Sequence, residues 1–441
     1  MTSPLLAPGN TDETLTTSLL EYVWRKPTRG WKQLLAFGLS GTALLVFCLI
    51  WLISRGIGVW GNNNTVGWGF DIINFVWWIG IGHAGTLISA ILLMFQQQWR
   101  TSINRAAEAM TLFAVVCALM YPTVHTGRPW FDWWMLPYPS TLGIGPQFKS
   151  PLIWDVVAVS TYGTVSLLFW YVGLIPDLAT LRDRSPSRVA RLVYGIFALG
   201  WRGSGRHWSH WKLGYLMLAA LATPLVLSVH SVVSFDFSVG ILPGWHTTIF
   251  PPYFVAGAVF SGFAMVVLLL LPASRLLGLT HVITPRHFDN MNKIILATGL
   301  IVTYGYAMEH FMAWYSGSEA EYTLFFRTRA SGPYAPFYWL MLFCNCVVPL
   351  VFWWPKARVT PWIMFTVAIA VNVGMWLERF VIVVVSLHRD FLTSSWALYT
   401  PTWVDICMYL GSLLFFFTNM LLFLKFIPAV AASEVKELNH A

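Results

Sequence analysis

Three side chains that can exchange protons stand at the ends of long apolar segments: His125, Asp155 and Asp236. His125 occurs in YPTVHTGRPW, next to a helix break, where a side chain can face a cavity. Asp155 lies inside an apolar segment, past its first turn, with no basic neighbour in the same helix. Asp236 closes another such segment. Because a charge in hydrocarbon costs a few kcal/mol or more, these groups predict a functional site.

These residue types suit the proton-coupled oxidation of a quinol. One polar group would hydrogen-bond each hydroxyl, and a base that titrates near neutral pH would take the proton as the electron departs. We therefore predict His125, Asp155 and Asp236 as catalytic residues, with His230 and Arg379 as weaker quinol-binding residues. The pattern predicts no metal site.

Ten apolar segments must position these side chains. The sequence is 57% hydrophobic and only 10% charged, whereas a soluble domain is about a quarter charged, so we expect an all-α integral membrane protein. Stretches of about 20 apolar residues predict ten transmembrane helices. The predicted spans are 33–54, 69–96, 106–124, 150–175, 212–233, 246–272, 293–315, 334–354, 360–385 and 403–427.

The basic residues predict how these spans are oriented. Of 27 Lys and Arg residues, 20 lie in the N-terminal segment, the even-numbered loops and the C-terminal segment, and 6 lie in the odd-numbered loops. This excess predicts that both termini are cytoplasmic. It also accounts for most of the net charge of +8, so we expect lipid headgroups and no nucleic acid as its partners.

With this orientation, most ionisable residues within the spans fall near the outer face. Because a helix rises 1.5 Å per residue, Glu309 lies about 24 Å outward from Lys293 in a core of roughly 30 Å. His83 is predicted near mid-depth and Glu108 near the inner face. The residues predicted at the shared outer depth are His125, Asp155, His230, Asp236, Glu309, His310, Glu378, Arg379 and Asp405.

Several of these residues have a structural alternative. Asp71 and Asp405 stand in first helical turns, where a carboxylate caps free N–H groups. Arg379 could form a buried ion pair with Glu378 or with Glu309. His83, in the sequence GIGHAG, could make an interhelical hydrogen bond where small residues let helices approach.

Short matches between distant segments predict an internal repeat. Because four spans separate the copies, both have the same orientation, unlike the inverted repeats common in transporters. The matches are SPLIW at 150–154 with APFYW at 335–339, DF at 236–237 with DF at 390–391, and EAM at 108–110 with DNM at 289–291. The predicted organisation is a cytoplasmic N-terminal segment 1–32, a first span with outer loop 33–68, four-helix bundles 69–233 and 246–385, a last span 403–427 and a cytoplasmic tail 428–441.

The cysteines predict no resident redox centre. All five lie within apolar spans, and the sequence has no C-x-x-C or C-x-x-C-H pattern. Iron–sulfur ligation and c-type haem attachment are therefore unsupported, so any metal centre of a redox reaction is expected in another subunit.

The segment YPTVHTGRPW, followed by SPLIWDVVAVSTYGTVSLLFWYVGLIPDLATLRDR, resembles the NrfD-like (polysulfide reductase membrane subunit) family, and within it the ActC branch of bacterial alternative complex III. The resemblance extends from the first span to the last. It implies a subunit of the bacterial cytoplasmic membrane that oxidises menaquinol near the periplasmic face and holds no haem or iron–sulfur cluster. By this resemblance, the quinol-site His falls on His125 and the carboxylates fall on Asp155 and Asp236.

The same resemblance implies partners and a second activity. The expected partners are an iron–sulfur subunit on the periplasmic face, c-type cytochrome subunits and a second NrfD-like membrane subunit. Proton translocation through the bundles is also implied, and Glu108 alone near the inner face leaves no continuous inner half-channel evident. The ionisable candidates for a proton path are His83, Glu108, Glu309, His310 and Glu378.

Two other classes of membrane protein remain as alternatives. A b-type cytochrome membrane anchor would use the histidines of different spans as haem ligands, although no span carries two histidines at opposed depths. A secondary transporter would be expected to show an inverted repeat and broken helices at mid-depth.

Overall fold

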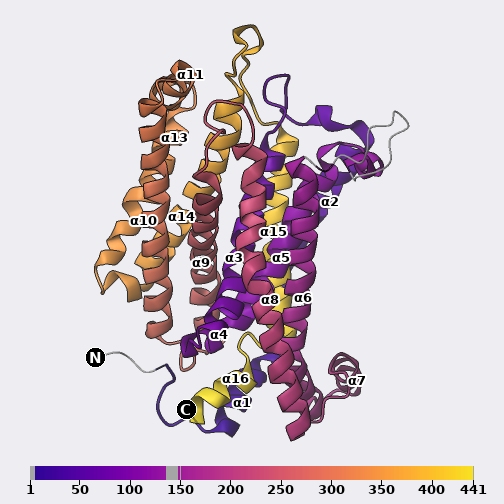
Figure 1. The fold of residues 1–441 in the computed structure, drawn as a ribbon. Coiled ribbons are helices and arrows are strands. Elements are labelled where there is room, and N and C mark those ends of the chain that lie inside the picture. Colours follow the sequence, from indigo (N-terminus) through magenta and orange to yellow (C-terminus); the bar gives the residue numbers. More distant parts are fainter. Residues whose placement is uncertain (1–4, 136–147, 149, 441) are drawn as a thin grey trace.

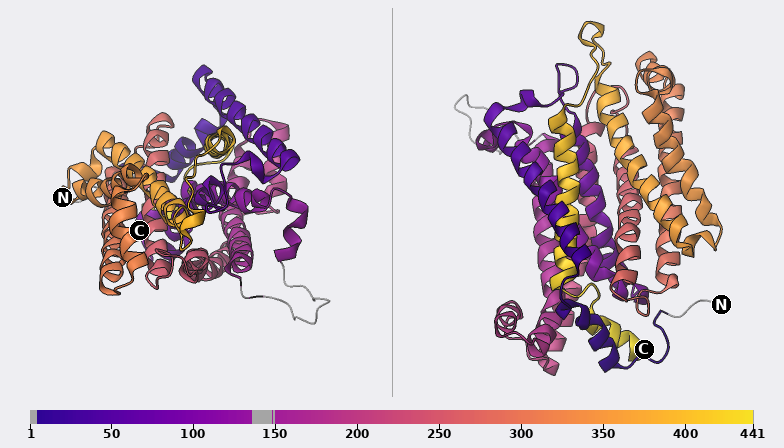
Figure 2. Two further views of the ribbon diagram at one scale, coloured as in Figure 1. Left: turned by 90° about the horizontal axis from the view of Figure 1, so that it is seen from above. Right: turned by 180° about the vertical axis from the view of Figure 1, so that it is seen from behind.

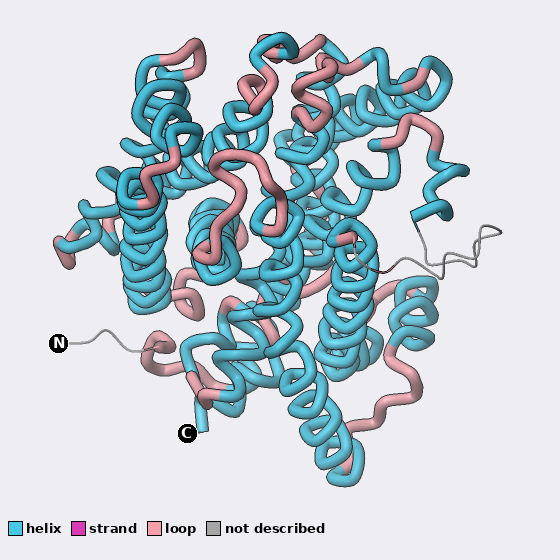
Figure 3. Tube along the Cα trace, turned by 45° about the horizontal axis from the view of Figure 1, so that its top comes forward, coloured by secondary structure: helices cyan, strands magenta, loops and turns pink. Residues whose placement is uncertain are grey.

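The computed structural model describes residues 5–135, 148 and 150–440. These residues form helices joined by loops, and Figure 3 shows no strand among them. Ten helical segments are long and apolar enough to cross a membrane, which confirms the predicted number of spans. Helices are expected here because backbone N–H and C=O groups in hydrocarbon must find partners within their own segment.

The ten spans and the shorter helices have the following bounds. The spans are α2 (Arg29–Arg55), α3 with η2 and α4 (Phe70–Met94), α5 (Asn104–His125), α6 (Pro151–Arg184), α8 (Gly205–Ser238), α9 (Phe250–Leu276), α10 (Pro285–Tyr315), α13 with η6 and η7 (Ala335–Trp353), α14 with η9 (Pro361–Val385) and α15 (Trp403–Phe426). The others are α1 (Asp12–Trp24), η1 (Ile57–Val59), η3 (Gln98–Ser102), η4 (Pro129–Met135), α7 (Arg188–Phe197), α11 (Glu319–Tyr322), η5 (Thr323–Thr328), α12 (Arg329–Ser331), η8 (Ala357–Val359), η10 (Thr393–Ser395) and α16 (Ala432–His440).

Several spans are longer than predicted, and α6 and α8 are the longest of the described helices. The predicted span 150–175 continues as α6 to Arg184, and the predicted span 212–233 belongs to α8, which begins at Gly205 and ends at Ser238. Both have 34 residues, about 51 Å, so they extend beyond a hydrocarbon core of roughly 30 Å. Hydropathy detects only the part of a helix that lies in hydrocarbon, so it underestimated both.

The spans form two four-helix units. In the first unit, α3, α5, α6 and α8 contact one another in that order, and α8 also contacts α3. In the second unit, α9, α10, α13 with η6 and η7, and α14 do the same, and α14 also contacts α9. The view from above in Figure 2 shows the units side by side, with α3 packed against α9 between them. The same order of contacts in both units is what a parallel repeat requires.

The core lies where the two units meet. The most apolar windows of α3 and α9 are each 83% buried, whereas that of α2 is 28% buried. Hydropathy alone does not decide this difference, because the mean hydropathy of α2 is 2.3 and that of the span that contains α3 is 1.6; α2 packs mainly on α15 at the edge of the molecule. Large apolar side chains of α2, including Phe37 and Phe47, are exposed on the surface that a membrane would cover.

The two ends of the molecule differ. Both chain termini lie at one end together with α1, α7 and α16, and α11 lies at the other (Figure 1). We call the end with the termini the basic end, because the predicted cytoplasmic loops belong to it. The end of α5, the start of α6 and the end of α8 lie at the opposite end, so the chain brings three predicted site residues to one level.

Candidate functional site

His125, Asp155 and Asp236 line one cavity of about 500 Å³ in the first unit. The predicted grouping of these three residues is therefore found. His125 ends α5, because Gly127 follows with a φ of +69°, in the left-handed region where helices commonly stop. The rest of the wall is mostly apolar and includes Trp68, Ile72, Phe75, Leu119, Leu152, Val156 and Val159. A cavity of this size with a few converging polar groups suits a largely apolar small ligand.

Asp71 orients His125. Its Oδ2 pairs with Nδ1 of His125, and its Oδ1 accepts the N–H of Gly69 at 2.9 Å, so the predicted role in the first turn of α3 is also found. The Asp71 side chain is buried, whereas a quarter of the His125 side chain is exposed. Because a carboxylate holds Nδ1, Nε2 is the ring nitrogen left for a ligand. The sequence did not reveal this role of Asp71, because its place in the first turn of a span predicted only a helix cap.

Asp155 and Asp236 form a pair of carboxyl groups. Their side chains lie against each other where α6 contacts α8, and Asp155 is only 6% exposed. Apart from the contact between the two carboxyl groups themselves, the described residues offer no hydrogen-bond partner to either oxygen of Asp155 or to Oδ1 of Asp236. Because buried polar atoms are nearly always paired, these oxygens mark a place where a ligand or a proton can bind.

His230 does not belong to this cavity, contrary to its predicted depth. Its ring contacts the ring of His83 in α3, with centroids 4.3 Å apart, and both residues are fully buried. The prediction was wrong because it ended the fifth span at residue 233. Since α8 continues to Ser238, His230 lies two turns before its end and deeper in the bundle.

His83 bonds within its own helix, and it also meets the backbone of Val226 in α8, across the kind of helix contact that its alternative assumed. Its Nδ1 donates to the carbonyl of Ile79 at 2.8 Å, and its ring stacks on Tyr162 of α6 with centroids 5.3 Å apart. The Tyr162 hydroxyl in turn donates to the carbonyl of Gly82 at 2.9 Å. Polar groups therefore continue below the cavity to the middle of the first unit.

Arg379 also lies away from the cavity. It pairs with Glu378 on the same helix, and its guanidinium lies 4.3 Å from the centroid of the Phe254 ring in α9. Both charged side chains are buried. Of the two ion pairs that the sequence allowed, the one with Glu378 is found, which gives Arg379 a structural role at the contact between α9 and α14.

Glu108 is not isolated near the basic end, contrary to expectation. Tyr215 of α8 donates its hydroxyl to Glu108 at 3.0 Å, and both residues are buried. Two buried ion pairs lie nearby: Arg105 with Asp177 at 3.1 Å, and Arg100 with Glu434 of α16. The sequence did not show this cluster, because the partners are far apart in the chain. Asp177 lies tens of residues from Arg105, and Glu434 lies hundreds of residues from Arg100.

Asp405 caps α15, as predicted. Its Oδ2 accepts the N–H of Thr402 at 2.7 Å and the N–H of Gly61 at 2.9 Å. Thr402 and Asp405 form a reciprocal capping box, so this carboxylate is fully used in structure.

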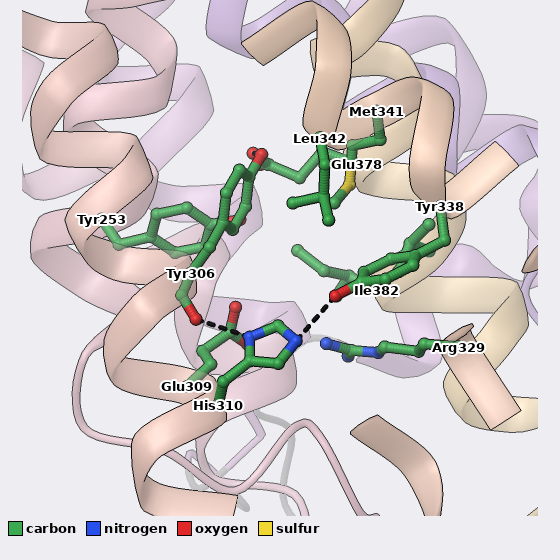
Figure 4. Close-up of a pocket in the computed structure, with 11 residues that line it drawn as sticks. Tyr253, Tyr306, Glu309, His310, Arg329, Tyr338, Met341, Leu342, Glu378 and Ile382 are labelled. Atoms are coloured by element: carbon green, nitrogen blue, oxygen red, sulfur yellow. Dashed lines mark hydrogen bonds between the residues drawn. The ribbon is translucent and has the colours of Figure 1, made fainter. Parts of the chain in front are cut away.

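The second unit holds a smaller pocket, shown in Figure 4. Tyr306 is central, because its hydroxyl pairs with Glu378 and accepts a hydrogen bond from Asn345 at 2.8 Å. His310 bonds through Nδ1 to the carbonyl of Tyr306 at 2.7 Å and through Nε2 to the Tyr338 hydroxyl at 2.6 Å. The space left is about 10 Å³, enough for about one water molecule.

Glu309 and Arg329 complete this pocket. The guanidinium of Arg329 enters from α12 and points toward His310 and Glu309 (Figure 4). It also lies 4.0 Å from the centroid of the Phe325 ring, and Arg329 is only 3% exposed. The predicted proton-path residues Glu309, His310 and Glu378 therefore surround one pocket.

Residues 58–389 match the family model described as "Polysulphide reductase, NrfD". This region is most of the chain. The protein belongs to the NrfD family. The matched region contains the first and second four-helix units and every predicted site residue, while α2 and α15 lie outside it. The closer resemblance to the ActC branch stays a prediction.

Two curated relatives agree with the NrfD family. The chain is 26% identical over 258 residues to a protein of Halobacterium salinarum assigned as a membrane subunit of dimethyl sulfoxide reductase, covering 57% of this chain and 53% of that protein. It is 22% identical over 227 residues to a subunit of the selenate reductase of Mesobacillus selenatarsenatis, covering 49% and 51%. The chain thus spans about half the length of the curated relatives it matches.

Among the described residues of this NrfD-family chain, the four histidines on which the haem alternative depends do not face one another as axial ligands would. His125 pairs with Asp71 and His310 with Tyr338, while the rings of His83 and His230 touch each other. Two axial ligands must face each other across a macrocycle, and rings 4.3 Å apart leave no room for one. The described geometry therefore does not favour the alternative of a b-type cytochrome anchor.

Proposed function

We propose that this protein binds a quinol in the cavity of the first unit, oxidises it there and passes the electrons to an iron–sulfur subunit docked at that end. The observation that carries the proposal is one mostly apolar cavity lined by an unpartnered carboxyl pair and by a histidine that a buried carboxylate orients. A quinol ring with its tail needs an apolar wall and a polar group at each hydroxyl.

The residues can take both protons of the reaction. Oxidation of a quinol to a quinone releases two electrons and two protons. Nε2 of His125 would accept one proton, and the Asp155–Asp236 pair would accept the other, which reduces the repulsion between two adjacent carboxylates. The electrons leave to an iron–sulfur cluster of the docked partner, because the cavity residues carry no group that stores them.

The relatives support this assignment in general terms. Both are named as subunits of reductases, and a reductase needs an electron donor that a quinol in the membrane can supply. From the resemblance we further propose menaquinol as the substrate, with c-type cytochromes and a second NrfD-like subunit among the partners. By the distribution of Lys and Arg, the termini would be cytoplasmic in a bacterial inner membrane, and the cavity would release protons to the periplasm.

Proton translocation would use two sets of buried groups. In the first unit, His83 and Glu108 lie in the bundle below the cavity, with Tyr162 beside the histidine and Tyr215 beside the carboxyl. In the second unit, Glu309, His310 and Glu378 surround one pocket with room for a water molecule. Hydrogen-bonded side chains and single waters are the groups from which proton relays are built.

Replacing Asp155 with Asn tests the proposal, because the change keeps the shape and removes the base. In the assembled complex we expect quinol:acceptor turnover to fall at least about 100-fold. Asp236→Asn should give a similar loss, since each residue is half of one pair. Retention of normal turnover in both variants would exclude the proposed role.

Asp390→Asn is the matched control. Asp390 is the counterpart of Asp236 in the predicted repeat, and it accepts the N–H of Leu392 at 2.9 Å in a loop outside the cavity. Turnover of this variant should stay within about twofold of the unchanged protein, because no cavity group is altered. An equal loss in the control would mean that the assay reports assembly and not the cavity.

A further inference from the structure

Helix α7 (Arg188–Phe197) lies beside the spans at the basic end (Figure 1). Two hydrogen bonds define its level: Tyr171 of α6 donates to the carbonyl of Phe197, and Tyr194 donates to the carbonyl of Phe426, the last residue of α15, each at 2.8 Å. Tyr171 lies 20 residues beyond Pro151, about 30 Å along α6, which equals the thickness of the hydrocarbon core. Helix α7 therefore lies at the boundary between membrane and water.

One face of α7 is apolar and exposed. Its spacing of three and four residues gives a single stripe along the helix. The stripe consists of Val189, Leu192, Val193 and Ile196, which are 72%, 66%, 44% and 62% exposed. The other face packs on the protein, where Tyr194 meets Trp24 edge to face. At this level an exposed apolar stripe would contact acyl chains, as in helices that lie in the plane of a membrane.

Basic side chains without acidic partners surround this helix. Arg188, Arg191, Arg202 and Arg206 are exposed, and the described residues provide no ion pair to any of them. By contrast, the neighbouring Arg184 pairs with Glu13 at 2.8 Å. Cations left unpaired at a membrane boundary attract anionic headgroups, each contributing about fivefold in affinity.

A polar cavity of about 470 Å³ lies between the end of α6, the segment that leads into α8 with the start of that helix, and α16. Two of its acidic groups are already paired, Asp183 with Arg182 and Glu437 with Lys212. Its third, Asp177, pairs with Arg105. The cations that remain in its wall are Arg202 and Lys436, next to Trp201 and Trp208. Charge complementarity therefore favours an anion, and Trp is the side chain typical of the headgroup level.

We propose that α7 and this cavity form a binding site for one anionic phospholipid of the leaflet at the basic end. The phosphodiester would bind Arg202 and Lys436, with Arg206 close by in sequence, and the acyl chains would lie along the apolar stripe of α7. The site is independent of the quinol cavity, which lies at the opposite end of the bundle. Its function would be to hold the basic end at the membrane surface.

Native mass spectrometry of the full-length protein in neutral detergent tests this site. The protein is titrated with phosphatidylglycerol and, separately, with phosphatidylcholine. We expect at least about tenfold tighter binding of the anionic lipid. In the double variant Arg202→Gln and Lys436→Gln, phosphatidylglycerol should bind about 30-fold more weakly, while phosphatidylcholine binding is unchanged. Equal affinity for the two lipids in the unchanged protein would overturn the proposal.

The double variant Arg275→Gln and Lys356→Gln is the matched control. Both side chains are exposed at the basic end and lie outside the cavity, so the same charge is removed elsewhere. Its affinity for phosphatidylglycerol should equal that of the unchanged protein. If this variant binds as weakly as the Arg202 and Lys436 variant, general surface charge explains the binding and the site does not exist.

Two further experiments distinguish binding of a lipid from binding of a free anion. Millimolar inorganic phosphate should displace little phosphatidylglycerol, because it lacks the acyl chains that contact α7. Replacing Leu192 and Ile196 with Gln should weaken lipid binding without unfolding the protein, as size-exclusion chromatography would verify. Complete displacement by phosphate, with no effect of the Leu192 and Ile196 changes, would show an anion site without a lipid and would overturn the proposal.

Discussion

The two four-helix units share one order of helix contacts but hold their ionisable groups differently. In the first unit, Asp155 and Asp236 contact each other, have no other partner at the oxygens described above and line a cavity of about 500 Å³. In the second unit, Glu378 pairs with Arg379 and with Tyr306 beside a space of about 10 Å³. A buried charge that is left unpaired next to a cavity indicates ligand chemistry, whereas a paired charge without space indicates structure or proton relay.

The counterparts in the repeat explain the difference. When Pro151 is aligned with Pro336, the position of Asp155 corresponds to Leu340. When Glu108 is aligned with Asp289, the position of His125 corresponds to Tyr306. The second unit thus replaces one carboxyl with an apolar residue and the histidine with a tyrosine inside a hydrogen-bond network. The same scaffold therefore supports a binding cavity in one unit and a filled interior in the other.

Arg379→Met should have the largest effect of the proposed changes, and this effect should be a loss of stability. Glu378 would remain as a buried charge without its partner, which costs about 3–5 kcal/mol. The free energy of unfolding, measured by denaturant titration in detergent, checks this value. Arg327→Met is the control, because Arg327 is exposed and the change should stay within about 0.5 kcal/mol. A loss below about 1 kcal/mol for Arg379→Met would mean that the ion pair does not hold the second unit together.

Asp155→Leu gives the first unit the residue that the second unit has at the corresponding position. Turnover should fall at least about 100-fold, because one half of the carboxyl pair is removed. Thermal stability should be unchanged or higher, since burying a carboxyl without a partner is unfavourable. Quinol:acceptor assays and thermal melting of the same preparation check both expectations. A strongly destabilised variant would show that Asp155 is structural, and the contrast between the units would fail.

Tyr306→Phe removes the hydroxyl at the centre of the second unit. Hydrogen bonds to charged groups contribute about 1.5–3 kcal/mol, so the free energy of unfolding should fall by about 2 kcal/mol. Quinol turnover should stay within about twofold, because the residue is remote from the cavity. The control is Tyr304→Phe, since Tyr304 is exposed on the same helix. A large loss of quinol turnover without a loss of stability would contradict this prediction and would indicate that the second unit takes part in catalysis.

Asp71→Asn should have the smallest effect, about tenfold on turnover, because it weakens one hydrogen bond that contributes about 1–1.5 kcal/mol. Asn keeps the shape but holds Nδ1 of His125 less firmly and removes the negative charge that stabilises the protonated ring. The loss should appear in kcat with little change in KM, because Asp71 positions His125 and does not line the cavity. Asp71→Glu should restore part of the activity. Equal changes in kcat and KM for Asn and Glu would indicate general damage to the start of α3.

The depth of a residue along its own helix could be predicted from the sequence, whereas the residues that it contacts on other helices could not. His125, Asp155 and Asp236 meet because all three stand at the same ends of neighbouring spans, and helix rise converts residue number into depth. His230 was misplaced because the end of α8 was predicted five residues too early, which moved it outward by more than a turn. An error in a helix end therefore becomes an error in the membership of the site.

Contacts between side chains of different helices could be determined only from the folded structure. The pairing of Asp71 with His125 depends on how α3 packs on α5, and the pairing of Arg100 with Glu434 depends on where α16 docks. Neither packing leaves a periodic signal in the chain. The same is true of the space beside Asp155, because a cavity is what remains after side chains from several helices have packed.

The sequence by itself determined the ten spans and the level of the three cavity residues, and it predicts the orientation of the spans from Lys and Arg. These properties follow from hydropathy, charge and helix rise, which are additive along the chain. Only the tertiary structure decided which charges are paired and which are free: Arg379 bound to Glu378, His230 against His83, and Asp155 against Asp236. The reason is physical, since the cost of a buried charge depends on its neighbours from other helices, and these are set by packing.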